Sequence, residues 1–181
     1  MTNRPIPSPH RPPHIYAGNT TYFVTGSIHK GARLLAPPTH KPHLQQELLT
    51  LAPDYGLELF AWVILDNHYH LLFHLAESEN LHRFFKRFHG RSAFTFNKWD
   101  HQPGRQVWYN YWDRCIRDER DYWTHFNYIH YNPIKHGYAR QLRDWPFSSI
   151  FIYLEREGRN WLDDCWRKYP IKEFEIENDD F

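Results

Sequence analysis

The sequence predicts an α+β fold in which helices pack on one face of an antiparallel sheet. Extended segments rich in β-branched and aromatic residues alternate with segments whose apolar residues recur at helical spacing. Two extended segments are separated by only a pair of turn-forming residues, which is the length of a tight hairpin. The chain has 181 residues, so we expect one domain with a substantial core.

The expected elements follow one another as strand, helix, strand, strand, helix, strand and helix. Their approximate ranges are residues 21–28, 42–52, 57–65, 68–75, 77–99, 106–116 and 118–132. This order is close to that of ferredoxin-like folds. Before the first strand, residues 1–19 are rich in proline, histidine and arginine, so we expect an extended N-terminal arm there.

The first strand and the first helix have clear local signals. Residues 21–28 combine threonine, valine and isoleucine with two aromatic residues, which is typical of a strand. In the following helix, leucines recur at helical spacing, and Pro42 lies in the first turn, where its missing N–H costs nothing. The sequence Pro-Asp-Tyr-Gly at residues 53–56 then ends the helix.

The predicted hairpin carries the first candidate site. Residues 57–65 are almost wholly apolar, as in a central strand, and the Asp-Asn pair at 66–67 is of a kind that tolerates positive φ. Alternate side chains of the returning strand share a face, so His68 and His70 point the same way and Tyr69 points into a core. Two such imidazoles can bind one divalent metal ion. Because the chain has 14 histidines, two structural histidines remain the commoner explanation of this pattern alone.

The long helix expected at residues 77–99 is amphipathic and basic. Its apolar residues recur at i, i+3, i+4 and i+7 from Leu81, and Gly90 marks a place where it can be interrupted. Its opposite face carries four cations: Arg83, Lys86, Arg87 and Arg91. No acidic residue occurs between Glu79 and Asp100. Cations at this spacing suit a nucleic-acid phosphate backbone, and the alternative is a solvated charged face.

The last predicted helix carries the second candidate site. It opens with Asp118 as N-cap and is expected to end before Pro133. Tyr128 and Asn132 lie one turn apart on the same face. A tyrosine hydroxyl can act as a nucleophile when a metal or a base activates it, and an amide oxygen can complete a metal shell with two imidazoles. The alternative is a core tyrosine followed by an ordinary helix end.

Composition excludes several classes of protein. The net charge of +1 combines a mildly basic body with an acidic tail at residues 154–181. Cys115 and Cys165 lie far apart without CxxC spacing, so we expect neither a disulfide framework nor a zinc ribbon, and a reducing cytoplasm fits. We see no signal peptide and no apolar run long enough to span a bilayer. Serine-hydrolase, P-loop and dinucleotide-binding motifs are also absent from the sequence.

Taken together, these motifs resemble a known family. The run at residues 66–72 resembles the HUH motif of single-tyrosine transposases, in which U is a hydrophobic residue. The run at residues 128–137 resembles the tyrosine helix of the REP-associated tyrosine transposases. Shorter segments also resemble this family, and they are residues 86–92, 112–114, 116–119 and 145–149. The resemblance covers roughly residues 15–153.

The resemblance implies a ferredoxin-like core with the HUH residues on a central strand and the catalytic tyrosine on a helix. Tyr128 would be the nucleophile, and His68, His70 and Asn132 would bind a divalent metal ion, Mg²⁺ or Mn²⁺. The implied activity is that of a transposase: a metal-dependent single-stranded DNA endonuclease and strand transferase. It would cut beside a palindromic hairpin through a 5′-phosphotyrosine intermediate. Tyr69 at the U position is a mild departure, because an aromatic side chain still packs into a core.

The implied partner is single-stranded or hairpin DNA, without a membrane, and the chain would act as a monomer or homodimer. The residues expected to contact DNA are Arg83, Lys86, Arg87, Arg91 and Arg114. The transposase domain would span residues 20–153. Two alternatives stay open. One is a hairpin-DNA-binding protein without catalysis, and the other is a metal-dependent phosphohydrolase that uses water, with Tyr128 structural.

Overall fold

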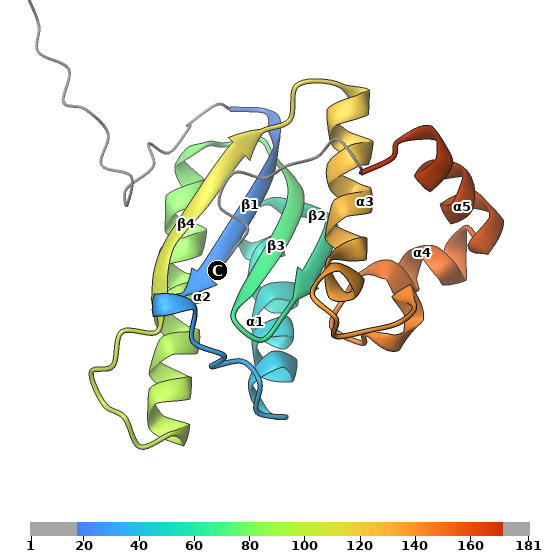
Figure 1. Ribbon diagram of the computed structural model, residues 1–181. Coiled ribbons are helices and arrows are strands. Elements are labelled where there is room, and N and C mark those ends of the chain that lie inside the picture. The colour runs from blue at the N-terminus through green and yellow to red at the C-terminus, as the bar shows by residue number, and fades with distance from the viewer. Residues whose placement is uncertain (1–17, 172–181) are drawn as a thin grey trace, which may run out of the picture.

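Four antiparallel strands form one sheet in the order β2-β3-β1-β4 (Figure 1). The computed structural model describes residues 18–171. The strands are β1 (Thr20–Ile28), β2 (Leu57–Ile64), β3 (His68–Leu75) and β4 (Trp108–Cys115). The helices are α1 (His40–Asp54), α2 (Glu79–Trp99), α3 (Glu119–Lys135), α4 (Ile150–Arg156) and α5 (Arg159–Lys168), with short 3₁₀ turns η1 (His29–Gly31) and η2 (Leu142–Asp144). The predicted α+β, ferredoxin-like fold is confirmed.

The strand β3 lies in the interior of the sheet, because it pairs with both β1 and β2. The predicted hairpin of β2 and β3 is present, with Ile64 opposite Tyr69. Its turn differs from the prediction, since neither Asp66 nor Asn67 has a positive φ. The side chains of these two residues accept hydrogen bonds that stabilise the turn instead.

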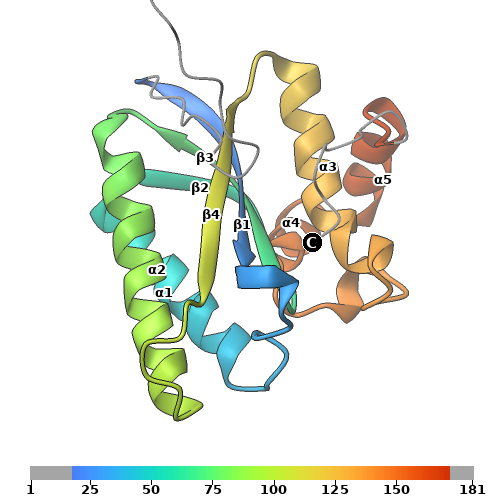
Figure 2. The same ribbon diagram turned by 60° about the vertical axis from the view of Figure 1, so that its left-hand side comes forward.

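Helices cover both faces of the sheet, whereas the sequence predicted helices on one face only. One face is covered by α1 and α2, and the other by α3, with α4 and α5 beyond it (Figure 2). The side chains of β3 alternate between the two cores. Tyr69 packs with Phe88 of α2, and Leu72 belongs to the cluster of Ile129 in α3. The inner strands are apolar on both sides because both of their faces are buried.

Tyr69 packs into the core beneath α2, as the sequence predicted. The residue is 1% exposed, and a hydrogen bond of 2.7 Å joins its Oη to Nε2 of His89. Burial lowers the pKa of His89 to about 3, so this imidazole stays neutral. The ring lies directly over Gly26 of β1, where a Cβ atom would come within 2.2 Å of it. This close approach requires glycine at position 26.

Two helices differ from the sequence prediction. The helix α2 continues through Gly90 without interruption. The helix α3 continues through Pro133 to Lys135, so the predicted end at Asn132 was wrong. A proline in the last turn removes only one helical hydrogen bond, and the residue before it is disfavoured but not forbidden in the helical region. Here Asn132 and Pro133 are both buried, and their packing outweighs that cost.

The helix α3 ends at Lys135, and Gly137 follows two residues later. Gly137 has φ of 71°, the left-handed conformation that commonly ends a helix. The N–H of His136 donates to the carbonyl of Asn132 at 3.0 Å, and the N–H of Tyr138 donates to the carbonyl of Pro133 at 2.8 Å. The sequence signal for this end is therefore the glycine and not the proline.

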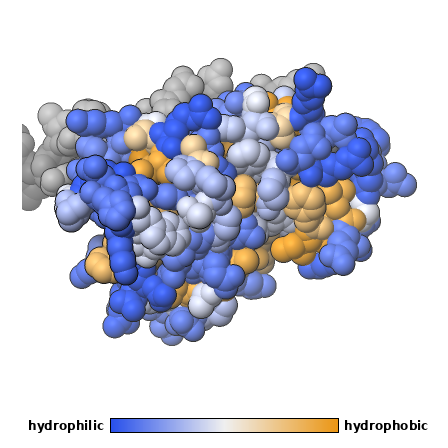
Figure 3. All heavy atoms as spheres, turned by 90° about the horizontal axis from the view of Figure 1, so that it is seen from below, coloured by the Kyte–Doolittle hydropathy of each residue, from blue (hydrophilic) through white to orange (hydrophobic). Residues whose placement is uncertain are grey.

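The helices α4 and α5 pack beside α3, which the sequence did not predict. The buried amide Nδ2 of Asn127 in α3 donates to the carbonyls of Cys165 at 3.1 Å and Tyr169 at 2.8 Å. On the lower face of the molecule, an apolar patch lies on the side of α4, which exposes Phe151 and Ile152 (Figure 3). No described helix is long and apolar enough to cross a membrane.

The predicted division into an arm, a transposase domain and an acidic tail stays a prediction. Residues 1–17 of the arm and residues 172–181 of the tail lie outside the described part of the chain.

Candidate active site

The two histidines of β3 lie side by side under α3. His68 is 1% exposed and His70 is fully buried, and their ring centroids are 4.9 Å apart. They face the same side of the sheet because one residue separates them in a strand. Only the sheet topology decides which side this is, and it is the side that α3 covers.

A hydrogen bond at Nδ1 orients each ring. His68 Nδ1 lies 2.8 Å from Oδ1 of Asn67, and His70 Nδ1 lies 2.8 Å from Oγ1 of Thr25. Thr25 is the residue of β1 directly opposite His70 in the sheet. Metal-binding histidines usually have such a partner on the second nitrogen, which fixes the tautomer and the ring orientation. In both histidines, Nε2 is then the nitrogen available to bind a metal.

Asn132 meets His68 from α3, although the two residues are 64 positions apart in the sequence. Its Oδ1 lies 3.3 Å from Nε2 of His68, and its Nδ2 is buried without a hydrogen-bond partner among residues 18–171. If Nδ1–H of His68 donates to Asn67, then Nε2 presents a lone pair to Oδ1, and two acceptors face each other. A cation bound by both atoms would remove this repulsion between two lone pairs.

The donor set therefore fits a divalent ion. Imidazole nitrogens and an amide oxygen are acceptable ligands for Mn²⁺, and Mg²⁺ accepts the oxygen more readily than the nitrogens. Within residues 18–171 there is no group of three or more His, Cys, Asp or Glu side chains suited to a metal. Any metal at this place would thus depend on the amide of Asn132 as its third protein ligand.

Tyr128 lies beside the histidines on the same face of α3 as Asn132. The residue is 2% exposed, and its ring centroid is 5.4 Å from that of His70. Phe23 of β1 packs against both rings, at 6.2 Å from Tyr128 and 5.5 Å from His70. Nζ of Lys135 lies 3.5 Å from the Tyr128 hydroxyl oxygen. The structure thus brings together all four residues predicted as nucleophile and ligands.

Two histidines that neighbour Tyr128 in the sequence are held in other contacts. His130 Nε2 is 2.8 Å from Oγ of Ser149, and burial lowers its pKa to about 3. His125 Nδ1 is 2.7 Å from the carbonyl oxygen of Asp121, and burial lowers its pKa to about 4. Both imidazoles are therefore neutral near pH 7, and both contribute to the packing of α3.

The sequence did not predict the ion cluster beside this site. The buried ammonium of Lys41 in α1 donates to Oδ1 of Asp66 at 2.6 Å, and Arg33 donates to Oδ2 at 2.6 Å. Asp66 immediately precedes Asn67 and His68, so the cluster anchors the turn from which the histidine strand begins. Burial alone would raise the pKa of Asp66, but its hydrogen bonds to Lys41 and Arg33 lower it overall. No spacing in the sequence indicates this pairing.

His136 also lies beside the site, although the sequence did not predict it there. Its ring centroid lies 5.2 Å from that of His68, and the residue is exposed. His136 belongs to residues 128–137, which resemble the tyrosine helix of the family. Because the sequence predicted that α3 ends at Asn132, it did not predict where the side chain of His136 would lie.

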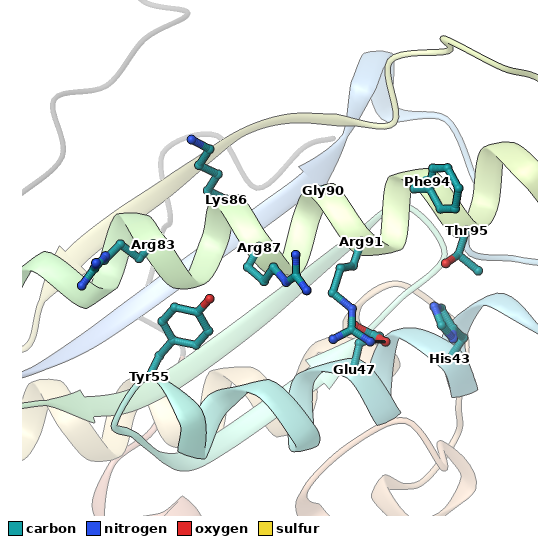
Figure 4. A pocket seen from close by; sticks show the side chains of 10 residues that line it. All are labelled: His43, Glu47, Tyr55, Arg83, Lys86, Arg87, Gly90, Arg91, Phe94 and Thr95. Atoms are coloured by element: carbon teal, nitrogen blue, oxygen red, sulfur yellow. Dashed lines mark hydrogen bonds and ion pairs between the residues drawn. The ribbon is translucent and has the colours of Figure 1, made fainter.

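The predicted DNA-contacting residues do not join this site. Four of them line an open hollow of about 840 Å³ between α1 and α2 (Figure 4): Arg83, Lys86, Arg87 and Arg91. This hollow lies on the opposite face of the sheet from Tyr128. The helix has no acid of its own there, but Glu47 of α1 pairs with Arg91 at 2.8 Å. Arg114, on β4, pairs with Asp121 of α3 at 3.2 Å.

A second basic hollow, of about 260 Å³, lies at the C-terminal end of α3. It has an apolar floor that includes Ile134 and Leu162, and its rim carries Arg140, Arg143 and Arg159. Among the described residues, neither Arg140 nor Arg143 forms an ion pair. No spacing in the sequence indicates this cluster, because Arg140 lies in a loop, Arg143 in η2 and Arg159 in α5.

Comparison with known proteins identifies the class of protein to which this chain belongs. A family model described as "Transposase IS200 like" matches residues 29–131. The REP-associated tyrosine transposase of Escherichia coli (strain K12) is 31% identical over 135 residues, which cover 74% of this chain and 77% of the relative. The putative REP-associated tyrosine transposase of Haemophilus influenzae is 38% identical over 123 residues, covering 59% of this chain and 69% of the relative.

A solved structure agrees with these relatives. It is described as the REP-associated tyrosine transposase bound to a REP hairpin. It matches with a TM-score of 0.65 and 26% sequence identity, over 82% of this chain and 87% of the other. The chain belongs to the family of REP-associated tyrosine transposases. The resemblance drawn from the sequence is thereby confirmed, while the roles of individual residues stay predictions.

Proposed function

We propose that this chain is a metal-dependent single-stranded DNA endonuclease and strand transferase that cuts beside a palindromic hairpin. The observation that supports this most directly is the meeting of α3 with β3. Tyr128 and Asn132 lie against His68 and His70, at 5.4 Å between the Tyr128 and His70 rings and 3.3 Å between Asn132 Oδ1 and His68 Nε2. Family membership supports the reaction class, and this cluster contains the groups that the proposed reaction would use.

In the proposed step, the hydroxyl oxygen of Tyr128 attacks a backbone phosphorus in line with the bond to the 3′ oxygen. An O–P bond to the tyrosine forms and the P–O3′ bond breaks. The 3′ oxygen leaves with a proton, and the phenolic proton is released, so the protonation balances. One DNA end is a 5′-phosphotyrosine and the other a 3′-hydroxyl. A 3′-hydroxyl can reverse the step, so strand transfer needs no nucleotide energy source.

His68, His70 and Asn132 would hold the divalent ion, Mg²⁺ or Mn²⁺. When bound, it supplies Lewis-acid polarisation of the scissile phosphate. The chain's own contribution is orientation: Asn67 and Thr25 fix the two imidazoles, and α3 fixes Tyr128 and Asn132 on one rigid element.

The hollow between α1 and α2 supports binding of a duplex stem by its phosphates. Its cations are exposed and lie at helical spacing, which suits backbone contacts without base readout. The hairpin bound to the related solved structure motivates this assignment for Arg83, Lys86, Arg87 and Arg91. Arg114 on the edge strand β4 is proposed as an additional contact. A monomeric or homodimeric state and a cytoplasmic location, with Cys115 and Cys165 as free thiols, stay predictions.

The test is adduct formation with a labelled hairpin oligonucleotide and Mn²⁺. Wild-type protein should form a covalent protein–DNA adduct, and Tyr128→Phe should form none. Tyr131→Phe is a matched control, because Tyr131 lies on the same helix but packs against Trp166 at 5.5 Å.

Each alternative has its own outcome. A persisting adduct in Tyr128→Phe contradicts the assignment of the nucleophile. Cleavage to a free 5′-phosphate without an adduct indicates a water-using phosphohydrolase. Binding without any cleavage indicates a hairpin-binding protein without catalysis.

A further inference from the structure

We infer that Lys135 holds the scissile phosphate of the DNA against Tyr128. The inference rests on the proposed function, because it assumes that Tyr128 is the nucleophile. It goes beyond it by assigning a substrate contact to a residue that lies outside the matched family segment, residues 29–131.

The position of the lysine ammonium is the observation that supports this inference. Nζ of Lys135 lies 3.5 Å from Oη of Tyr128 and 5.3 Å from the centroid of its ring. Tyr128 is buried, whereas Lys135 is exposed, so the contact at Oη joins a buried group to a residue that reaches solvent. A phosphate that enters on the side of Lys135 would meet the ammonium beside Oη.

The continuation of α3 through Pro133 produces this position. Seven residues are almost two full turns, so Lys135 lies on the same helical face as Tyr128, about 10 Å further along the axis. Side chains of a helix lean towards its N-terminus, and the long lysine stem leans back over the intervening turn. Had the helix ended at Asn132, the sequence spacing would not have placed the two residues together.

The charge has a clear use in the proposed step. In-line attack on a phosphodiester spreads negative charge over the nonbridging oxygens, and fixed cations stabilise it. These oxygens are two bonds from Oη in the product, within reach of a group that already contacts Oη. The proposed ligands His68 and Asn132 contact each other between β3 and α3. Lys135 contacts the Tyr128 hydroxyl from one turn further along α3 than Asn132, so the two charges would act on the phosphate from different places. Lys135 keeps its protons throughout and donates a hydrogen bond to a nonbridging oxygen, so it alters no proton balance.

The first experiment compares two substrates in the adduct assay. One hairpin oligonucleotide carries a normal phosphodiester at the cut site, and the other carries a methylphosphonate there, which removes the negative charge. We expect Lys135→Gln to slow adduct formation about 10- to 100-fold on the phosphodiester. On the methylphosphonate, wild type and variant should differ by about 3-fold or less, and Lys135→Arg should recover most of the rate. The control Lys98→Gln removes an exposed charge from α2 and should change neither rate.

An equal penalty on both substrates overturns the inference, because a merely structural lysine would not distinguish a charged from a neutral phosphate. Full activity of Lys135→Gln on the phosphodiester overturns it as well.

The second experiment measures binding and does not depend on cleavage. In the Tyr128→Phe background, Lys135→Gln should weaken binding of the phosphodiester oligonucleotide about 3- to 10-fold and lower the salt slope by about 0.7. It should leave binding of the methylphosphonate oligonucleotide unchanged. If wild type forms no adduct, the proposed function fails on that result, and this binding comparison still decides the role of Lys135. Equal losses of affinity for both oligonucleotides contradict it.

Discussion

The two faces of the sheet differ in burial and in charge. On the α3 face, His68, His70 and Tyr128 are each at most 2% exposed, and the side chains of Asn67 and Thr25 orient the two imidazoles. On the α2 face, Arg83 and Lys86 are exposed and line an open hollow. Bond-making groups must be fixed within a fraction of an ångström, which burial provides. Phosphate binding needs only mobile surface cations, so the two tasks suit opposite faces.

The largest effect is expected from removing a proposed metal ligand. His68→Ala should lower cleavage of the hairpin oligonucleotide by about 100-fold or more, because even the partners of metal ligands contribute 10- to 100-fold. The same variant should keep its affinity for the hairpin, since the proposed stem-binding cations lie on the other face. Cleavage and binding are measured on the same preparations. His74→Ala is the matched control, because His74 lies further along the same face of β3.

If His68→Ala loses its fold, its DNA binding and its cleavage activity together, the proposed division of tasks between the two faces is contradicted. The histidine pair would then be structural, as the sequence pattern alone allows.

A smaller effect is expected at the cluster that joins the two faces. Lys41 belongs to α1, and its partner Asp66 lies in the turn before His68. Lys41→Met leaves a buried carboxylate with Arg33 alone, so we expect it to lower the free energy of unfolding by about 3 kcal/mol at pH 7. Urea unfolding measures this difference. Leu49→Met, at an exposed position of α1, is the control and should change little.

The same cluster predicts a pH dependence. The pKa of Asp66 is lower in the folded protein than its usual value of 3.8, so the folded state favours the carboxylate. Its contribution to stability is present above that usual value and is lost as the pH falls through the folded-state pKa. The difference between wild type and Lys41→Met should therefore shrink on acidification below pH 3.8. A difference that grows in acid would contradict this pairing.

The smallest effect concerns the hollow on the α2 face. The triple variant Arg83→Gln, Lys86→Gln, Arg87→Gln should weaken hairpin binding about 10-fold and lower the salt slope by about 2 to 3. The cleavage rate at saturating DNA should stay near that of wild type. This result would support the assignment of binding to the α2 face and of cleavage to the α3 face. An unchanged salt slope would instead point to the cations Arg140 and Arg143 of the smaller hollow as the stem contacts.

Local rules predicted much of the candidate site. Strand periodicity placed His68 and His70 on one face, and helical periodicity placed Tyr128 and Asn132 on another. Each of these statements depends on backbone geometry that repeats every two or every 3.6 residues. The same rules failed at Pro133, because the local preference against a helix there is small compared with the packing of a buried helix end.

The sequence by itself determined the order of the elements from β1 to α3, the family resemblance and the residues that share each face. Only the tertiary structure decided that α3 covers the histidine face, that the cations of α2 lie on the opposite face, and that Lys41 pairs with Asp66. It also decided that α3 continues far enough to bring Lys135 to Tyr128. The reason is the distance along the sequence over which each interaction acts. Periodicity is set by a few neighbouring residues, whereas these contacts join distant segments and form only when the whole core packs.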